Sequence, residues 1–319
     1  MTEGPQATNS GAGGRLAPSP SGLLHLGHAR TFLIAWWHAR ASGGRVVMRI
    51  EDLDGARASR EHSDAALRDL EWLGLDWDGP VKVQSQGIER LNDAVQRLLE
   101  LGLAYPCVCT RGDVRTAQSA PHQGDTELRY PGTCRGRFPS VAVAARASGR
   151  APGIRLRVPS ELVTFEDRLF GVQSFDVQAE VGDFLIARRD GAPAYQLAAV
   201  VDDAAQAVTE VVRGSDLLAS TARQRWLQRA LGLDEPTWLH VPLVLDASGR
   251  RLAKREADLS LAELRARAVD ARSIVEWAAR SAGLEVPSRA TAREVLAHFD
   301  VQRLRREPVL LRADTLPLG

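Results

Sequence analysis

The feature that most constrains the fold is a strand–turn–helix–strand pattern near the start of the chain. The segment "RLAPS" is predicted to be a short strand that ends in a Pro/Ser turn, and residues 26–42 form an apolar stretch with the length of a helix. Gly43 and Gly44 are predicted to end that helix. The next segment, "RVVMRIED" (45–52), is predicted to be a buried strand with acidic residues at its end. Such a compact unit implies two parallel strands joined by a right-handed crossover, and therefore an α/β fold.

Hydrophobic spacing predicts the elements that follow this unit. Apolar residues recur at helical spacing in two segments, and apolar runs typical of a parallel sheet resume later in the chain. The predicted elements are helices at about 60–74 and 86–102, strands at 194–204 and 207–214, a helix at 217–231 and a strand at 240–245. The chain after residue 261 is predicted to be helical and rich in arginine.

Changes in composition divide the chain into segments. The first is rich in Gly, Ser, Thr and Asn, which indicates disorder, and a Gly- and Pro-rich stretch with the cysteines interrupts the parallel-sheet pattern. The predicted segments are a disordered tail (1–14), the first half of a parallel-sheet domain (15–104), an inserted α+β subdomain (105–190), the second half of the sheet domain (191–250) and a loop with a helical C-terminal region (251–319).

Composition excludes several classes of protein. The 319 residues are 44% hydrophobic and 25% charged, and no apolar run approaches the ~20 residues that a membrane span needs. Residues 1–14 lack both a basic start and an apolar centre, so no secretion signal is predicted and a cytoplasmic location is expected. An odd number of cysteines, three, argues against a disulfide framework in such a chain. The net charge of +1 leaves nucleic-acid binding open, because that needs only a local basic surface.

The start of the predicted helix carries His25, Gly27 and His28. A helix N-terminus at the carboxyl end of a parallel strand offers free N–H groups and a partial positive charge, which suit a phosphate. Imidazole N–H groups there add donors to a phosphate whose charge grows during a reaction, and a glycine allows a flat base to approach the backbone. By itself the H-x-G-H pattern fits equally well two polar residues that decorate a helix end.

Lysine is nearly absent from the chain. Of 41 basic residues only Lys82 and Lys254 are lysines, and the other 39 are arginines. A lysine that remains in such a chain marks a candidate site for a compact ammonium, which a planar guanidinium does not replace. Lys82 is interpreted as an exposed loop residue, whereas Lys254 follows the polar segment "GRRLA" and is the candidate.

Several motifs together resemble a known family. "PSPSGLLHLGH" and "RLAKR" resemble the two signatures of the class I aminoacyl-tRNA synthetases, and "RLAPSPSG", "RIEDLD" and "VVRGSDLL" resemble the glutamyl branch. The resemblance runs from about residue 15 to residue 260 with the motifs in the family's order. It implies a Rossmann-type parallel sheet with an inserted zinc-containing α+β subdomain. Four ordered motifs in one chain are far more specific than any one of them.

The resemblance implies an ATP site. His25 and His28 would contact the phosphates and Gly27 would lie beneath the adenine, with ATP bound together with Mg²⁺. Activation of an amino acid means attack of its carboxylate on the α-phosphate while pyrophosphate leaves, a reaction carried by positioning and by charge stabilisation. Lys254 would supply a movable charge that follows the leaving phosphates. The usual lysine-rich pentapeptide is altered, because Arg251 replaces its first lysine and Ala253 and Arg255 replace its serines.

A glutamate substrate carries two carboxylates and one ammonium, so its pocket should contain cations and at least one anion. Arg15 and Arg213 are suited to bidentate pairing with carboxylates, Glu51 to holding the ammonium, and Tyr195 to donating its hydroxyl. In the resembling family these positions and two residues of the turn line the glutamate pocket. The predicted set is Arg15, Ala17, Ser19, Glu51, Tyr195 and Arg213.

The three cysteines fall in one window, which favours a zinc site over three small buried apolar residues. They are Cys107, Cys109 and Cys134. On chemistry alone His122 is the preferred fourth ligand, since a free tyrosine has a pKa of ~10. The resembling branch has a C-x-C…Y-x3-C pattern with tyrosine as a ligand, and a metal can depress a ligand's pKa. The resemblance therefore implies Tyr130, and His122 stays open.

The length of the chain refines the expected function. Full glutamyl-tRNA synthetases continue into helical domains that read the anticodon, whereas here only about 60 residues follow the second signature. This resembles the branch that lacks such a domain, activates L-glutamate with ATP and esterifies the queuosine base at the wobble position of tRNA(Asp). A monomer is expected. The alternatives are a shortened glutamyl-tRNA synthetase that charges the tRNA 3′ end, a non-catalytic paralogue that binds tRNA or a nucleotide, and an adenylate-forming ligase for a small molecule.

Overall fold

The structure, a computed structural model, describes residues 13–55, 58–117, 129–250, 252 and 260–311. The helices are α1 (Leu26–Ala41), α2 (Arg60–Trp72), α3 (Ile88–Glu100), α4 (Arg111–Ala117), α5 (Val141–Ser148), α6 (Val177–Glu180), α7 (Tyr195–Ala205), α8 (Leu218–Leu231), α9 (Leu261–Ala266), α10 (Ala271–Ala282) and α11 (Ala292–Val295). The strands are β1 (Gly14–Leu16), β2 (Val46–Ile50), β3 (Lys82–Val83), β4 (Ala104–Cys107), β5 (Gly153–Leu156), β6 (Val163–Asp167), β7 (Gly171–Phe175), β8 (Leu185–Ala187), β9 (Glu210–Gly214), β10 (Thr237–Val241), β11 (Val244–Leu245) and β12 (Val309–Leu310). Short 3-10 helices cover Gln84–Gly87, Ser215–Leu217, Leu296–His298 and Val301–Arg303.

Parallel strands form the centre of the molecule, which confirms the predicted α/β class. Strands β1, β2 and β3 pair in parallel in that order, and β9, β10 and β6 form a second parallel set. The two sets meet where the backbone N–H groups of Thr209 and Glu210 donate to the carbonyl of Gly13. Strand β1 and strand β9 therefore lie side by side.

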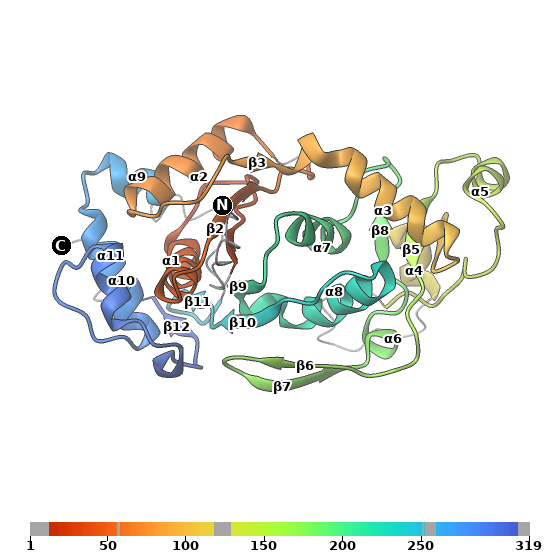
Figure 1. Cartoon of the computed structure of the whole chain (residues 1–319). Helices are drawn as coiled ribbons and strands as arrows, with labels where there is room; N and C mark the ends of the chain where they lie inside the picture. The colour runs from red at the N-terminus through yellow and green to blue at the C-terminus, as the bar shows by residue number, and fades with distance from the viewer. Residues whose placement is uncertain (1–12, 56–57, 118–128, 251, 253–259, 312–319) are drawn as a thin grey trace, which may run out of the picture.

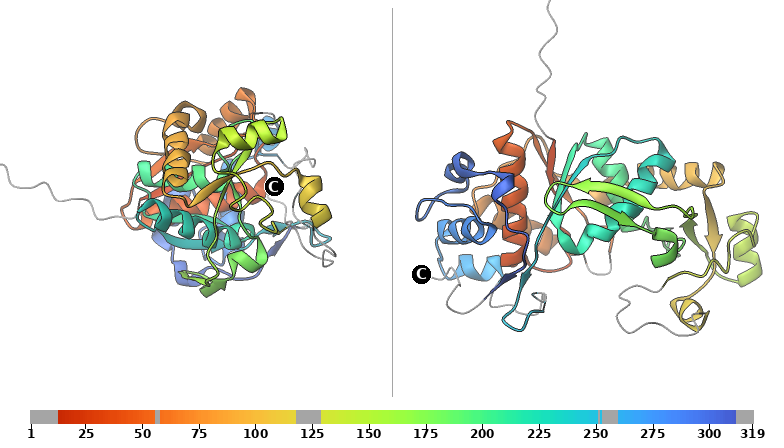
Figure 2. Two further views of the ribbon diagram at one scale, coloured as in Figure 1. Left: turned by 90° about the vertical axis from the view of Figure 1, so that its right-hand side faces the viewer. Right: turned by 90° about the horizontal axis from the view of Figure 1, so that it is seen from below.

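Helix α1 packs against this sheet and has nine buried residues. It contacts β1 and β9 on one side and α10 on the other, and Figure 2 shows it between the C-terminal helices and the sheet. Trp36 and Trp37 are almost completely buried as a result. Because α1 has protein on both sides, its sequence is apolar around most of its circumference. This packing fixes the direction in which the N-terminus of α1 points, toward the carboxyl ends of β1 and β9.

The strand predicted at 194–204 is wrong, because this segment is helix α7. Residues Leu197–Asp203 are all buried, since α7 packs between α3 and α8. A helix that is covered on several sides shows no polar face, so its apolar run cannot be distinguished from a buried strand by periodicity. The helices predicted at 60–74, 86–102 and 217–231 are confirmed as α2, α3 and α8 with small shifts of their ends.

The strand predicted at 240–245 is divided in two. Strand β10 ends at Val241 and the short β11 begins at Val244, with Pro242 between them. Proline has no N–H group and interrupts the ladder of hydrogen bonds. Strand β11 then pairs with β12 from the C-terminal region, which is otherwise made of short helices as predicted.

Residues 105–190 contribute to two sheets. Strands β4, β5 and β8 form a small antiparallel sheet with α4 and α5 beside it, at the opposite end of the molecule from α10 and α11 (Figure 1). Strand β6, with its hairpin partner β7, instead joins the central sheet through β10. The hairpin thus brings Asp167, its last β6 residue, next to the strands that form the pocket.

Two sequence predictions concern the chain ends and membranes. Gly14, placed at the end of the predicted tail, is the first residue of β1, and residues 1–12 lie outside the described part of the chain. Among the described helices none combines the length and the apolar character required to span a membrane.

Candidate active site

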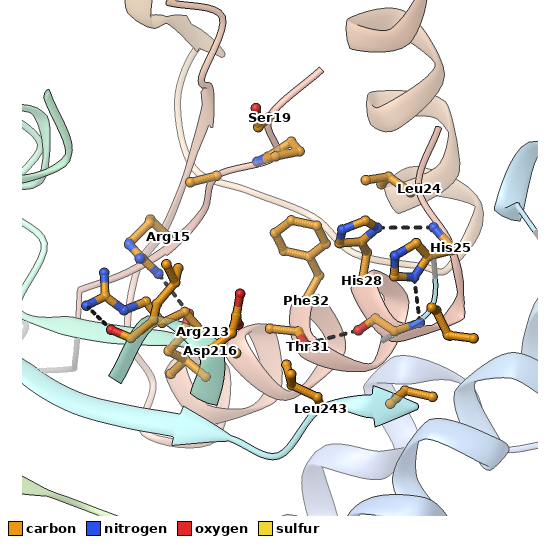
Figure 3. A pocket seen from close by; sticks show the side chains of 18 of the residues that line it. Arg15, Ser19, Leu24, His25, His28, Thr31, Phe32, Arg213, Asp216 and Leu243 are labelled. Atoms are coloured by element: carbon orange, nitrogen blue, oxygen red, sulfur yellow. Dashed lines mark hydrogen bonds between the residues drawn. The ribbon is translucent and has the colours of Figure 1, made fainter. Parts of the chain in front are cut away.

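A cavity of about 270 Å³ lies where the N-terminus of α1 faces the ends of β1 and β9 (Figure 3). Eight residues that the sequence analysis assigned to nucleotide or glutamate binding line it together. They are Arg15, Ala17, Ser19, His25, Gly27, His28, Tyr195 and Arg213. Segments about 200 residues apart in the chain therefore contribute to one pocket.

The two histidines are organised by the start of α1. His25 is the N-cap residue, and its Nδ1 accepts a hydrogen bond from the N–H of Gly27 at 3.1 Å. The Nδ1 atom of His28 accepts from the N–H of His25 at 3.2 Å. A ring nitrogen that accepts carries no proton, so each neutral imidazole has its proton on Nε2. The pair thus presents N–H donors beside a helix N-terminus, an arrangement suited to a phosphate.

Gly27 leaves room for the His25 ring. A Cβ atom at this position would lie 3.0 Å from Cε1 of His25 and 3.1 Å from its Nδ1. Those contacts are tighter than ordinary van der Waals contact, so a side chain here would displace the imidazole. The glycine that the sequence analysis expected beneath a base therefore also keeps His25 in its capping position.

Arg15 belongs to a balanced group of charges on one wall. Its Nε lies 3.5 Å from Oδ1 of Asp203, and the same oxygen lies 2.8 Å from an η nitrogen of Arg49. Arg49 also binds Oε1 of Glu51 at 2.9 Å. Burial works against the charge of Arg49, but Asp203 and Glu51 outweigh it and raise the pKa of this guanidinium. The two arginines and the two acids of this group therefore neutralise each other, and of the four only Arg15 lines the cavity.

Glu51 stands at one end of that group and not in the lining of the cavity. It follows β2, and its backbone N–H donates to the carbonyl of Pro18 in the turn at 3.0 Å. This bond connects β2 to the turn whose residues do line the cavity. The predicted ammonium ligand thus lies next to the lining residue Pro18, and Arg49 holds one of its carboxylate oxygens.

Arg213 differs from Arg15 because no carboxylate in the described residues forms an ion pair with it. Its side chain is buried with 5% exposure, and its donors go to neutral groups. Nε donates to Nε2 of His240 at 3.1 Å, and an η nitrogen donates to Oε1 of Gln224 at 2.7 Å. Burial and the positive charge of Arg15 lower the pKa of Arg213, but a guanidinium keeps its charge at neutral pH. A buried cation that forms no ion pair with a described carboxylate therefore lines this cavity.

The three cysteines form a second site, which lies within the inserted segment. The Sγ atoms of Cys107, Cys109 and Cys134 all lie within 4.8 Å of one another, and those of Cys109 and Cys134 are 3.5 Å apart. The hydroxyl of Tyr130 lies 3.4 Å from Sγ of Cys107 and 3.7 Å from Sγ of Cys109. A tetrahedral zinc with bonds of about 2.3 Å separates its sulfur ligands by about 3.8 Å. The donor set therefore fits zinc, and His122 lies outside the described residues.

Tyr130 is also fixed by the protein around it. Its hydroxyl accepts a hydrogen bond from the N–H of Cys134 at 2.8 Å, and Arg155 covers its ring with Cζ 3.7 Å from the ring centre. Burial, together with the hydrogen bond to Cys107, raises the pKa of Tyr130. A bound cation would act in the opposite direction.

Comparison with known proteins decides the family. A family model described as "tRNA synthetases class I (E and Q), catalytic domain" matches residues 13–305. The chain belongs to the class I aminoacyl-tRNA synthetases. It is therefore a ligase. This confirms the resemblance that the signatures indicated.

Two relatives of this synthetase carry the same name. A protein of Symbiobacterium thermophilum named "Glutamyl-Q tRNA(Asp) synthetase" is 45% identical over 314 residues, which cover 95% of this chain and 97% of that protein. A protein of Nocardia farcinica with that name is 47% identical over 306 residues, which cover 96% of this chain and 95% of that protein. The crystal structure of a glutamate–tRNA synthetase from Elizabethkingia anophelis has the same fold, with a TM-score of 0.81 at 23% identity over 96% of this chain and 69% of that one.

Sequence reasoning missed several residues that line the synthetase pocket. Thr31 and Phe32 lie one helical turn after Gly27 and His28, so i, i+4 spacing along α1 was the signal that could have found them. Asp216 follows Arg213 within "VVRGSDLL", and a Cβ atom on Gly214 would lie 2.5 Å from its Oδ1. The glycine therefore allows the strand end and this carboxylate to approach each other.

Lys254 lies outside the described residues of the synthetase. The described residues on either side of it both lie at the pocket. Leu252 lines the cavity, and Ser260 pairs with His25 through a β-bridge. The N–H of Leu261 also donates to the carbonyl of Leu24 at 2.8 Å. Leu252 of the second signature therefore lines the same cavity as the histidines at the start of α1.

Proposed function

We propose that this synthetase activates L-glutamate with ATP and transfers the glutamyl group to the queuosine base at the wobble position of tRNA(Asp). In the first step an oxygen of the α-carboxylate bonds to the α-phosphorus while the bond to pyrophosphate breaks. In the second step a hydroxyl of the queuosine cyclopentenediol attacks the acyl carbon, and AMP leaves. The name shared by relatives 45–47% identical over nearly the whole chain supports the choice of acceptor.

The observation that carries the choice of amino acid is the unbalanced charge of Arg213. Arg15, Arg49, Asp203 and Glu51 neutralise one another, whereas Arg213, a buried cation that lines the cavity, forms no ion pair with a described carboxylate. Glutamate has a net charge of −1 at neutral pH and would bring Arg213 a carboxylate partner. A buried cation left without an anion costs several kcal/mol, which favours such a ligand (~3–5 kcal/mol when a pair is broken).

The positions of the side chains support one orientation for the two carboxylates of the substrate. Arg15 and Arg213 lie at one side of the pocket and His25 and His28 at the other (Figure 3). The α-carboxylate has to meet the phosphate, so it points toward the histidines. The side-chain carboxylate then points toward the arginines, with Tyr195 beside it and the turn residues Ala17 and Ser19 along its length.

The remaining roles follow the same division. His25 and His28 donate from Nε2 to the phosphates, and the adenine lies against Gly27. Lys254 follows the leaving pyrophosphate, and ATP enters as its Mg²⁺ complex. Glu51 receives the ammonium group of glutamate. Because its Oε1 binds Arg49, the other carboxylate oxygen takes this role.

We further propose that zinc binds to Cys107, Cys109, Cys134 and Tyr130. The zinc would be structural, because the cluster lies in the insertion and no lining residue of the pocket belongs to it. Its effect would be to hold the end of β4 to the segment around Cys134.

Charging of tRNA tests the proposed function. Radiolabelled glutamate is offered with tRNA(Asp) that carries queuosine, with tRNA(Asp) that lacks it, and with tRNA(Asp) whose 3′-terminal adenosine has been removed. The expected result is charging that requires queuosine and survives removal of the adenosine. Charging of tRNA(Glu) that is lost with its terminal adenosine would instead establish a shortened glutamyl-tRNA synthetase. Glutamate-dependent exchange of ATP and pyrophosphate without charging of any tRNA would indicate a small-molecule ligase.

A further inference from the structure

Three buried residues connect the insertion hairpin to the pocket. Asp167 ends β6, His240 lies on β10 and Arg213 lies on β9, and these strands are neighbours in the sheet. His240 and Arg213 are register partners, and Trp238 of β10 pairs with Asp167. The exposed fractions of the three residues are 1%, 0% and 5%, so water does not screen their interactions.

The hydrogen bonds of Asp167 show which of its partners donate. Oδ2 accepts from Nδ1 of His240 at 2.7 Å and from the backbone N–H of His240 at 2.9 Å. Oδ1 accepts from the N–H groups of Leu169 and Phe170 at 3.0 and 2.9 Å. Burial opposes the charge, but these donors hold the pKa of Asp167 below its usual value. Asp167 is therefore an ionised acceptor, and the proton of His240 is on Nδ1.

The other ring nitrogen of His240 must then be an acceptor. Nε of Arg213 always carries a proton, and it lies 3.1 Å from Nε2 of His240. The hydroxyl of Thr221 lies 3.2 Å from the same nitrogen. Burial is the main reason why the pKa of His240 lies below its usual value, which agrees with a neutral ring. A second proton on this ring would face the Arg213 N–H and break the contact.

This arrangement holds Arg213 without neutralising it. With the bonds to Gln224, Thr221 and the carbonyl of Leu217, four of its five N–H donors are directed at the protein. A carboxylate in direct contact with Arg213 would compete with an anionic substrate. Asp167 instead acts through an imidazole, so it orients the guanidinium while its charge stays one ring away.

We propose that Asp167 and His240 are positioning residues that orient Arg213 for the side-chain carboxylate of the amino-acid substrate. The substrate class rests on the proposed function, whereas the chain of hydrogen bonds does not. The insertion hairpin thereby contributes to amino-acid selection, although none of its residues lines the pocket in the described part of the chain.

Two substitutions of His240 separate orientation from folding. In His240→Gln the amide oxygen can reach the place of Nε2 and accept from Arg213. In His240→Asn the shorter amide can donate to Asp167 but leaves Arg213 without an acceptor. We expect His240→Asn to raise the KM for glutamate about 10- to 100-fold in ATP–pyrophosphate exchange, with the KM for ATP and kcat nearly unchanged. His240→Gln should recover most of the affinity.

Asp167→Asn adds an independent test of the same contact. Its amide can donate to Nδ1 of His240, which moves the ring proton to Nε2 and against Arg213. The KM for glutamate should rise as in His240→Asn. The matched control is His38→Asn, which removes another histidine paired with a carboxylate, Glu210 of β9, outside the pocket. That variant should keep the wild-type KM for glutamate.

The measurements distinguish a failure of the proposed substrate from a failure of the positioning role of Asp167 and His240. If the wild-type chain exchanges ATP and pyrophosphate without glutamate dependence, the proposed substrate is wrong, and ¹⁵N NMR of histidine-labelled protein still tests the positioning. The imidazole signal that disappears in His240→Asn is assigned to His240. In the wild type this signal should report a neutral ring with its proton on Nδ1, and in Asp167→Asn the signal should change. Unchanged KM values for glutamate in folded His240→Asn and Asp167→Asn, or a proton on Nε2 in the wild-type ring, would overturn the inference.

Discussion

The rings of His25 and His28 stack with their centres 3.7 Å apart, and each ring gives its Nδ1 to a backbone N–H at the start of α1. One nitrogen of each ring therefore stabilises the helix end, while the other carries a donor proton. The two tasks belong to different atoms, so substitutions can separate them.

His28→Asn and His28→Gln should have opposite effects. Asparagine can replace the Nδ1 acceptor but has no donor at the place of Nε2, so kcat for ATP–pyrophosphate exchange should fall about 100-fold while the melting temperature stays near wild type. Glutamine can replace the Nε2 donor but not the cap, so it should retain more activity and lose about 0.5–2 kcal/mol of stability. Exchange kinetics and thermal unfolding measure both. Equal effects of the two variants on rate and stability would contradict this division.

Lys254→Arg should reduce kcat for exchange strongly although it preserves the charge. A planar guanidinium cannot follow the leaving phosphates as a compact ammonium does, whereas the KM for glutamate should change little. Lys82→Arg is the matched control, because Lys82 is the other lysine and lies exposed on β3. If Lys254→Arg exchanged ATP and pyrophosphate at the wild-type rate, the presence of a lysine at this position would have no chemical cause.

Purified protein should contain about one zinc per chain, and Cys107→Ser or Cys134→Ser should release it and destabilise the insertion. Elemental analysis of protein prepared without chelator measures the metal. Tyr130→Phe and His122→Ala identify the fourth ligand. We expect zinc binding to be lost or weakened in Tyr130→Phe and retained in His122→Ala. Metal-free wild-type protein would exclude the zinc site.

Asp69 should make the stability depend on pH. Asp69 belongs to α2, and its buried side chain forms an ion pair with Arg265 of α9. Its Oδ2 has no hydrogen-bond partner among the described residues. Burial raises its pKa from 3.8 to about 6, although Arg265 opposes the shift. The folded chain then binds this proton more tightly than the unfolded chain, so the free energy of unfolding should fall by about 1–3 kcal/mol as the pH rises from 4 to 7.

Urea unfolding of wild type and Asp69→Asn at several pH values checks this expectation. The variant should lose the decrease between pH 4 and pH 7, because its amide does not ionise. A decrease of the same size in Asp69→Asn would assign the effect to another group.

The sequence was sufficient for features that depend on neighbours in the chain. His25, Gly27 and His28 lie within four residues at a helix start, so their grouping needed no knowledge of tertiary structure. The proposed zinc ligands were also predicted as a group, and the structure brings the three cysteines and Tyr130 together. The family could be inferred because its motifs are short, local and ordered.

Tertiary structure decided the features that depend on which segments become neighbours. Helix α7 was mistaken for a strand because its packing between α3 and α8 removes the polar face that marks a helix. The contact of Asp167 with His240 and of His240 with Arg213 depends on the order of β6, β10 and β9 in the sheet. No local pattern encodes that order, since hydrophobic alternation shows that a strand is buried but not which strand lies beside it. The charge left on Arg213 likewise became visible only when folding paired Arg15 with Asp203.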